Sequence, residues 1–334
     1  MTVAPNPALI LNRREIAGLM GSQDYLAAVE AGFRSYASGG ADVPMPMHIA
    51  AEFGAFHAKG ARLVLDRAYV AVKLNGNFPG NPRRNGLPTI QGLILLCDAT
   101  DGSVLAAMDS IEITLRRTAA ASVLAARFLA RHDAHCVAIC GCGEQGRAQL
   151  AALAQVMVIK RTLVWDLDPE KSREFARDMR RSLLLDVIAV SEVHEATRES
   201  DVIVTATTAR TPFLMRDMVP AGAFVAAVGA DSPEKSELAP ELMANATIVV
   251  DMLTQAATMG DLHHAIEAGL VTTDDVHAEL GDLVIGRKTG RKHSNEITLF
   301  DSTGTAIQDA ASAAWIYQRA MARNIGSSIM FSAL

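Results

Sequence analysis

The sequence lacks a long apolar run and an excess of positive charge. Its 31 Lys and Arg residues stand against 37 Asp and Glu, and the resulting net charge of −6 excludes non-specific nucleic-acid binding, which needs a basic excess. No apolar stretch approaches the roughly 18 residues of a membrane-spanning helix. The first residues place their arginines after the apolar stretch, the reverse of a secretory signal. We therefore expect a cytoplasmic protein with neither a membrane nor a nucleic acid as partner.

Cysteine is also scarce. Four cysteines among 334 residues give no disulfide framework. Cys136, Cys140 and Cys142 cluster, but their C-x3-C-x-C spacing lacks the paired Cys-x-x-Cys of zinc sites. We expect no metal and interpret the three as small apolar residues of a buried strand and its turn, with a metal site as the alternative.

Hydrophobic residues make up 50% of the chain and charged residues 20%, which predicts sizeable cores and, at this length, two domains. Apolar residues at helical spacing predict a helix over 22–37 and another over 111–130. Between them, short β-leaning runs alternate with turn signals from residue 42 to about 108. This part of the chain therefore predicts a sheet of its own.

After residue 134 the character changes to a regular alternation of apolar strands and helices of about ten to fifteen residues. This alternation is typical of a parallel, doubly wound sheet. The predicted fold class is α/β, a Rossmann domain over 118–308 beside a second, α+β domain over 1–117. An amphipathic helix beginning at Asp309 is expected to return to the N-terminal half, so that 309–334 joins the second domain.

The stretch GCGEQG carries the strongest motif. Gly141, Gly143 and Gly146 follow an apolar strand and precede a helix, and Asp166 ends the next strand 25 positions after Gly141. In a dinucleotide-binding turn the first glycine permits the tight bend and the second lets the backbone approach a pyrophosphate. The third allows close packing of the helix on the strand. We predict a nucleotide site here; the alternative is a tight turn without a ligand.

Asp166 also bears on the choice of cofactor. A carboxylate at this position accepts hydrogen bonds from a ribose 2′-hydroxyl and repels a 2′-phosphate, which favours NAD over NADP. Asp168, Lys171 and Arg173 lie nearby in the sequence, so NADP stays possible.

Two cations are candidates for holding an anionic substrate. Lys73 lies in the apolar run YVAVKL, where a lysine facing the interior needs an anionic partner; on the exposed face it would have no functional meaning. Arg117 is expected to head a helix of small apolar residues, where with Thr118 it can bind a carboxylate or phosphate at the helix start. Arg116 is expected to be solvated.

An acid follows a later strand. Asp231 comes after GAFVAAVGA, and ligands of open parallel sheets bind beyond the carboxyl ends of strands. Asp231 is therefore a candidate general base or a partner for an ammonium or iminium group. The alternative is a structural ion pair with Lys235.

Six stretches in the same order make the chain resemble the ornithine cyclodeaminase/mu-crystallin family over about 42–330. They are AVKLNGNFPGNP, GLPTIQGLILLCDATDGSVLAAMD, ITLRRTAAAS, GCGEQG, AVGADSPEKSEL and EITLFDSTGTAIQD. Within the family, the fifth and sixth of these and the closing NIGSSI look most like the alanine dehydrogenase branch.

The resemblance implies a substrate-binding domain that forms a homodimer through its sheet, and an NAD-binding Rossmann domain. It implies that Lys73 contacts the substrate carboxylate or imine, that Arg117 clamps the carboxylate, and that Asp231 activates the nucleophile or holds the amine. The cofactor-contacting residues it implies are Thr118, Gly141, Gly143, Glu144, Gln145, Gly146, Asp166, Thr207, Gly229 and Ser302.

One position departs from the family pattern. Many members carry an arginine where this chain has His48, and a neutral imidazole is a poorer carboxylate anchor than a guanidinium fork. Lys59 or Arg62 is expected to compensate, unless the substrate is held differently.

The residues and the resemblance together lead to three hypotheses. The first is an NAD(P)-dependent oxidoreductase acting on the C–N bond of a small α-amino or imino acid, as an alanine dehydrogenase or a ketimine or pyrroline-2-carboxylate reductase does. The second is a lyase that converts ornithine to proline with catalytic NAD. The third is a non-catalytic nucleotide-dependent binding protein.

Overall fold

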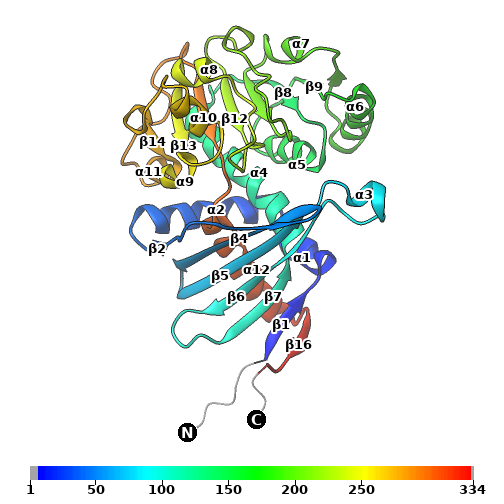
Figure 1. Ribbon diagram of the computed structural model, residues 1–334, viewed down its shortest axis with the longest axis vertical. Coiled ribbons are helices and arrows are strands. Elements are labelled where there is room, and N and C mark those ends of the chain that lie inside the picture. The colour runs from blue at the N-terminus through cyan, green and yellow to red at the C-terminus, as the bar shows by residue number, and fades with distance from the viewer. Residues whose placement is uncertain (1–6, 332–334) are drawn as a thin grey trace. The chain divides into compact units, whose positions relative to one another are not determined.

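A computed structural model describes residues 7–331, which fall into two compact units (Figure 1). Unit 1 comprises 7–117 and 305–331, and unit 2 comprises Thr118–Gly304. The sequence places the domain boundaries after residues 117 and 308. Among the described residues, no helix is long and apolar enough to cross a membrane.

Unit 1 contains a mixed sheet in the order β16-β1-β7-β6-β5-β4-β2. Strand β3 pairs with the first residues of β4, 54–58, whereas β2 pairs near the end of β4. All its strand pairs are antiparallel except β1 with β7. Its elements are β1 (Ala8–Leu11), α1 (Arg13–Leu19), α2 (Ser22–Ala37), β2 (Ala41–Asp42), β3 (Met47–Ala51), β4 (Gly54–Val64), β5 (Ala68–Asn77), α3 (Asn81–Arg84), β6 (Ile90–Asp98), β7 (Val104–Asp109), the first part of α4 (Ser110–Leu129), α12 (Ala306–Arg323) and β16 (Ser327–Ile329).

Helices α2 and α12 cover one face of this sheet, here called the inner face. Gly32 of α2 lets the two helices approach closely, because a Cβ there would lie 3.0 Å from the Cβ of Ala311 on α12. Small residues on the buried side of α12 also allow this helix to pack closely on the sheet, where Leu63 and Ile94 are fully buried. The helix returns to the N-terminal half as expected, and begins at Ala306, three residues before the predicted Asp309.

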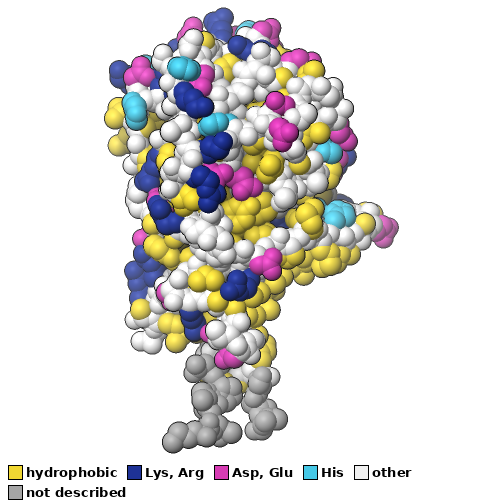
Figure 2. Space-filling view, turned by 90° about the vertical axis from the view of Figure 1, so that its left-hand side faces the viewer, with side chains coloured by type: hydrophobic (Ala, Val, Ile, Leu, Met, Phe, Trp, Pro, Cys, Tyr) yellow, Lys and Arg dark blue, Asp and Glu magenta, His cyan; other side chains and the backbone are white. Residues whose placement is uncertain are grey.

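The opposite, outer face of the sheet is apolar and exposed. Because side chains alternate along a strand, register assigns a set of large hydrophobic residues to this one face, each between 38 and 54% exposed. Part of the set is visible as the hydrophobic run at the lower right of Figure 2. The residues are Ile10, Met47, Ile49, Phe56, Val72, Leu74, Leu93 and Ile329.

Unit 2 is built on an all-parallel sheet in the order β10-β9-β8-β11-β12-β15-β13-β14. Its central strands are buried on both faces, as parallel strands between helical layers are. The elements are β8 (Cys136–Cys140), α5 (Glu144–Leu153), β9 (Arg161–Trp165), α6 (Pro169–Leu183), β10 (Val187–Ala189), α7 (Val193–Thr197), β11 (Val202–Thr205), η1 (Arg216–Met218), β12 (Phe224–Ala227), α8 (Pro240–Ala244), β13 (Thr247–Val250), α9 (Leu253–Ala256), α10 (Asp261–Glu267), η2 (Thr273–Asp275), β14 (Ala278–Glu279), α11 (Leu280–Val284) and β15 (Thr298–Asp301).

The predicted fold class is confirmed: a Rossmann-type parallel sheet accompanies a second α+β unit. In unit 2 the strand order changes direction between β8 and β11, and such a switch point is where open α/β sheets bind ligands. The glycine turn that follows β8 lies at this switch point.

Candidate active site

A buried charge cluster lies on the inner face of unit 1. The Nζ of Lys73 is 2.6 Å from Oδ2 of Asp309, and the Nε of Arg117 is 3.0 Å from Oδ1 of the same carboxylate. Arg117 also donates from Nη1 to Oε1 of Gln308 at 2.9 Å. All three charged residues are at most 5% exposed. One carboxylate thus holds two buried cations in fixed positions.

The surroundings set the ionisation of this cluster. Burial lowers the pKa of Lys73 to about 8; Arg117 and Lys59 add to the shift and Asp309 opposes it. Burial alone would raise the pKa of Asp309, but the charges of Arg117 and Lys73 bring it below its ordinary value. Asp309 is therefore a charged anchor rather than a proton donor at neutral pH.

The local structure explains why these side chains meet. Lys73 lies on β5 with its side chain on the inner face, so the exposed alternative for this residue is wrong. Arg117 does not head a helix: α4 begins at Ser110, and Arg117 lies about two turns further on. The expected contribution of a helix N-terminus at Arg117 is therefore wrong, and its neighbours Asp309 and Gln308 orient its guanidinium instead.

Asp309 and Gln308 were not among the predicted site residues. The sequence offered one signal: Asp309 stands among small apolar residues of the predicted helix, and a carboxylate that is buried in such a segment needs a cationic partner. Arg116, in contrast, is partly exposed, which agrees with its expected solvation. Its Nε lies 2.9 Å from Oε1 of Glu112.

His48 and Lys59 both lie on the inner face of the hairpin beside Lys73. His48 pairs in register with His57, with 3.4 Å between their Nδ1 atoms, and Lys59 pairs with Lys73. Arg62 is excluded as a compensating residue, because its position in β4 points to the outer face.

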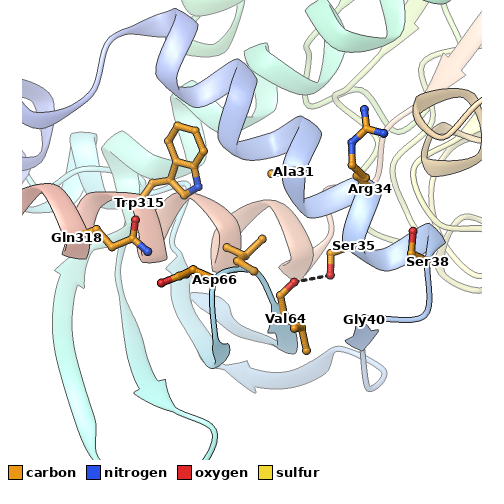
Figure 3. A pocket seen from close by; sticks show the side chains of 10 residues that line it. Ala31, Arg34, Ser35, Ser38, Gly40, Val64, Asp66, Trp315 and Gln318 are labelled. Carbon is orange, nitrogen blue, oxygen red and sulfur yellow. Dashed lines mark hydrogen bonds between the residues drawn. The ribbon is translucent and has the colours of Figure 1, made fainter.

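A pocket of about 550 Å³ opens elsewhere in unit 1, between α2, the end of β4 and α12 (Figure 3). Its polar lining includes Arg34, Asp66 and Trp315, and the hydroxyl of Ser35 donates to the carbonyl of Val64 at its wall. None of the predicted site residues lines it. This pocket is therefore separate from the residues for which the sequence predicted substrate chemistry.

The glycine turn of unit 2 has the backbone that its motif requires. Gly141 has φ +108°, and a Cβ there would lie 2.5 Å from the carbonyl oxygen of Ala206 beyond β11. A Cβ on Gly146 would collide with the carbonyl of Gly141. A Cβ on Gly143, at the start of α5, would meet nothing, which leaves space next to the helix N-terminus.

Several polar groups of unit 2, at the turn and at other positions of the unit, fit a bound dinucleotide. The Nε2 of Gln145 and the Oγ of Ser302 are buried and have no hydrogen-bond partner among the described residues. Asp166 accepts backbone hydrogen bonds from Cys142 at 2.8 Å and Asp168 at 3.0 Å, which fixes its carboxylate beside the turn. Glu144 is exposed in the first turn of α5 and Thr118 is buried on α4.

Thr207 and Gly229 contact a carboxylate that the sequence did not point to. Glu237 is fully buried, and its two oxygens accept from the hydroxyl of Thr205, the amide and hydroxyl of Thr207, and the amide of Gly229, at 2.6–2.9 Å. The glycine is needed because a Cβ at 229 would collide with this carboxyl group. Burial raises the pKa of Glu237 despite these bonds, and burial together with Glu237 raises that of Asp261 to about 7.

Asp231 is exposed beyond β12 and accepts from Nζ of Lys235 at 2.6 Å. The ion pair given as the structural alternative is therefore present. The three clustered cysteines are buried in β8 and its turn, and the described residues contain no group of three or more ligating side chains that could hold a metal.

Comparison with known proteins gives one family and several close structures. The model of the "Ornithine cyclodeaminase/mu-crystallin family" matches residues 7–324. An archaeal alanine dehydrogenase dimer with bound NAD is 37% identical over 98% of this chain and 100% of its own, with a TM-score of 0.92. Thermococcus litoralis Δ1-pyrroline-2-carboxylate reductase, in complex with NADH and L-proline, is 34% identical over 96% and 100%, with a TM-score of 0.92.

A third structure differs in the substrate it names. The iminosuccinate reductase of Paracoccus denitrificans, in complex with NAD+, is 33% identical over 98% of this chain and 100% of its own, with a TM-score of 0.91. The names of these three relatives thus point to three different substrates, although the relatives are almost equally similar in structure to this chain.

Proposed function

This chain belongs to the ornithine cyclodeaminase/mu-crystallin family, and on that premise we propose that it interconverts a small α-amino acid and its imino acid with NAD, as an alanine dehydrogenase or a pyrroline-2-carboxylate or ketimine reductase does. It is an enzyme, an NAD-dependent oxidoreductase acting on amino or imino acids. The observation that carries the proposal is the buried pair of cations, Lys73 and Arg117, held by one carboxylate. Such an excess of buried positive charge is stable only with an anion nearby.

The residues divide the work of this reaction as follows. Arg117 and Lys73 bind the α-carboxylate, and Asp309 keeps both in place, so that the α-carbon is presented in one orientation. Asp231 takes up or returns the proton of the amine or of an attacking water. NAD, held by the glycine turn and Asp166, supplies the hydride acceptor when it is bound.

The test is a panel of substrates followed by NADH absorbance, with both cofactors. It contains pyruvate with ammonium, pyrroline-2-carboxylate, piperideine-2-carboxylate and L-ornithine. A dehydrogenase or reductase changes NADH stoichiometrically, whereas a lyase consumes ornithine without accumulating it. Absence of turnover across the panel despite tight NADH binding, or an Asp231→Asn variant as active as the parent, would refute the proposal.

We expect Asp166→Ser to relax the choice of cofactor. Removing the carboxylate removes its repulsion of a 2′-phosphate and one acceptor for the 2′-hydroxyl, so the ratio of kcat/KM for NADPH to that for NADH should rise on the order of 10–100-fold. Steady-state kinetics with the two cofactors measures it. Asp168→Ser is the matched control, since serine also caps α6 and the ratio should not move; an equal rise in both variants would contradict the role of Asp166.

We also propose that the chain forms a homodimer through the outer face of the unit 1 sheet. That face gathers eight large exposed hydrophobic residues, a concentration that is typical of interaction surfaces, and the archaeal relative is a dimer.

Leu74→Glu should therefore shift the protein from dimer to monomer at micromolar concentration, because a symmetric interface would bury the new carboxylate twice. Light scattering after size exclusion measures the mass. Val158→Glu, at an exposed apolar position of unit 2, is the control that should stay dimeric. A dimer that survives Leu74→Glu would place the interface elsewhere.

A further inference from the structure

A buried amide nitrogen lies beside the charge cluster of unit 1 without an acceptor. The side chain of Gln308 is fully buried, and its Oε1 accepts from Nη1 of Arg117 at 2.9 Å. Its Nε2 has no hydrogen-bond partner among the residues that the structure describes. Glutamine is rarely buried completely, and a buried donor without an acceptor destabilises a fold. We therefore expect a group from outside the chain to supply the acceptor at Nε2.

The contact with Arg117 fixes the orientation of this amide. A guanidinium group only donates, so the carboxamide atom that faces Arg117 has to be the oxygen. The nitrogen stays close to the guanidinium: the oxygen and nitrogen of a carboxamide are about 2.3 Å apart, which places Nε2 within about 5 Å of Nη1. A donor of fixed direction thus lies next to the cation that we assign to the substrate carboxylate.

Gln308 belongs to a polar row on α12, a helix whose buried side is otherwise small and apolar. Thr305, Gln308, Asp309 and Ser312 follow one another at helical spacing, and each is at most 1% exposed. The hydroxyl oxygens of Thr305 and Ser312 also lack partners within residues 7–331. A hydroxyl rotates toward whichever acceptor or water is near, whereas Arg117 sets the direction of Nε2. Gln308 is therefore the member of the row that is best suited to a specific ligand contact.

We propose that Nε2 of Gln308 donates to the α-carboxylate of the bound amino or imino acid, next to Arg117. The inference rests on the proposed function and adds a substrate-binding residue to it. A carboxylate accepts at both oxygens and donates at neither, so it satisfies the amide and the guanidinium at once. Lys73 and Arg117 set two positive charges against the one negative charge of Asp309, a difference that one carboxylate balances. A neutral amide adds a hydrogen bond to that anion without disturbing the balance.

Two substitutions separate the roles of the amide oxygen and the amide nitrogen. Gln308→Glu keeps an acceptor for Arg117 but replaces the donor by a second oxygen, with a negative charge that repels the substrate carboxylate. Gln308→Met has a similar length and neither polar group. If the residue only oriented Arg117, the Glu variant would be the less damaged of the two. A contact between Nε2 and the substrate predicts the opposite order.

The first measurement is kcat/KM for the panel substrate that is turned over fastest. We expect Gln308→Met to lower it roughly tenfold, mainly through a higher KM, and Gln308→Glu to lower it at least tenfold further. The matched controls are Gln318→Met and Gln318→Glu, at an exposed position of the same helix, which should change it less than about twofold. NADH affinity should be equal in all four variants and the parent.

A double-mutant cycle with Arg117→Met provides a second test. If Nε2 itself binds the carboxylate, Gln308→Met lowers kcat/KM at least about threefold in the Arg117→Met background as well. If Gln308 acts only by orienting Arg117, the second substitution has no further effect there.

A binding measurement separates this inference from the proposed function. Propionate offers a carboxylate without an amine, imine or carbonyl group that could react. With NADH present it should raise the melting temperature of the parent, and Gln308→Met should need roughly tenfold more propionate for the same rise. If no panel substrate is turned over and this difference is seen, the proposed function fails and the carboxylate contact stands.

Four results would overturn the inference. They are a parent that propionate does not stabilise, an unchanged propionate affinity in Gln308→Met, a Gln308→Glu variant at least as active as Gln308→Met, and no further loss from Gln308→Met in the Arg117→Met background.

Discussion

Replacing Arg117 by methionine is expected to lower kcat/KM on the order of a thousandfold, or ~4 kcal/mol of transition-state stabilisation. The guanidinium is buried, and it is oriented by Asp309 and Gln308 before any substrate arrives. Its loss removes the fork that holds the α-carboxylate and leaves Asp309 with Lys73 as its remaining partner in the cluster. Arg117→Lys should recover part of the activity, because it restores the charge without the fork.

Arg116→Met is the matched control for this experiment. The two arginines are adjacent in the sequence, but Arg116 is partly exposed and pairs with Glu112, so its loss should change kcat/KM less than about twofold. NADH binding should be equal in both variants, which shows that unit 2 is intact. A loss of activity in Arg117→Met no larger than in Arg116→Met would remove the carboxylate clamp from the mechanism.

Local patterns in the sequence were enough to predict the fold and the nucleotide turn. Gly141, Gly143, Gly146 and Asp166 act through backbone geometry and a characteristic spacing within one βαβ unit, which a sequence pattern records. Lys73 was also visible, because a lysine within an apolar strand is costly and so informative.

The partners of these residues could not be predicted in the same way. Asp309 meets Lys73 and Arg117 across 192 or more positions of sequence, and only the return of α12 to the unit 1 sheet brings them together. The helix predicted over 111–130 begins at Ser110, but the separate expectation that Arg117 stands at a helix start was wrong, because the small apolar residues after Arg117 also look like the beginning of a helix. The inner-face position of Lys59 and the outer-face position of Arg62 depend on strand register, which a sequence pattern alone leaves open.

Glu237 is the residue of unit 2 whose loss should cost most, since it joins the ends of two strands. Its carboxylate accepts from Thr205 at the end of β11, from Thr207 just beyond it and from Gly229 after β12, and the side chain is fully buried. Glu237→Ala leaves two backbone amides without a partner, at roughly 1–3 kcal/mol each, and opens a cavity. We expect the free energy of unfolding to fall by about 3–5 kcal/mol and NADH affinity to fall with it.

Chemical denaturation and NADH titration of three variants test the role of Glu237. Glu241→Ala, an exposed acid in the first turn of α8, should cost only a few tenths of a kcal/mol. Glu237→Gln keeps the shape and one oxygen acceptor but turns an N–H toward donors that need an acceptor, so it should fall between the other two. It also keeps the test decisive if the alanine variant does not fold. An unfolding midpoint for Glu237→Gln equal to that of Glu241→Ala would mean that hydrogen bonds to the charged carboxylate do not hold β11 and β12 together, and that the ends of these strands are positioned by packing alone.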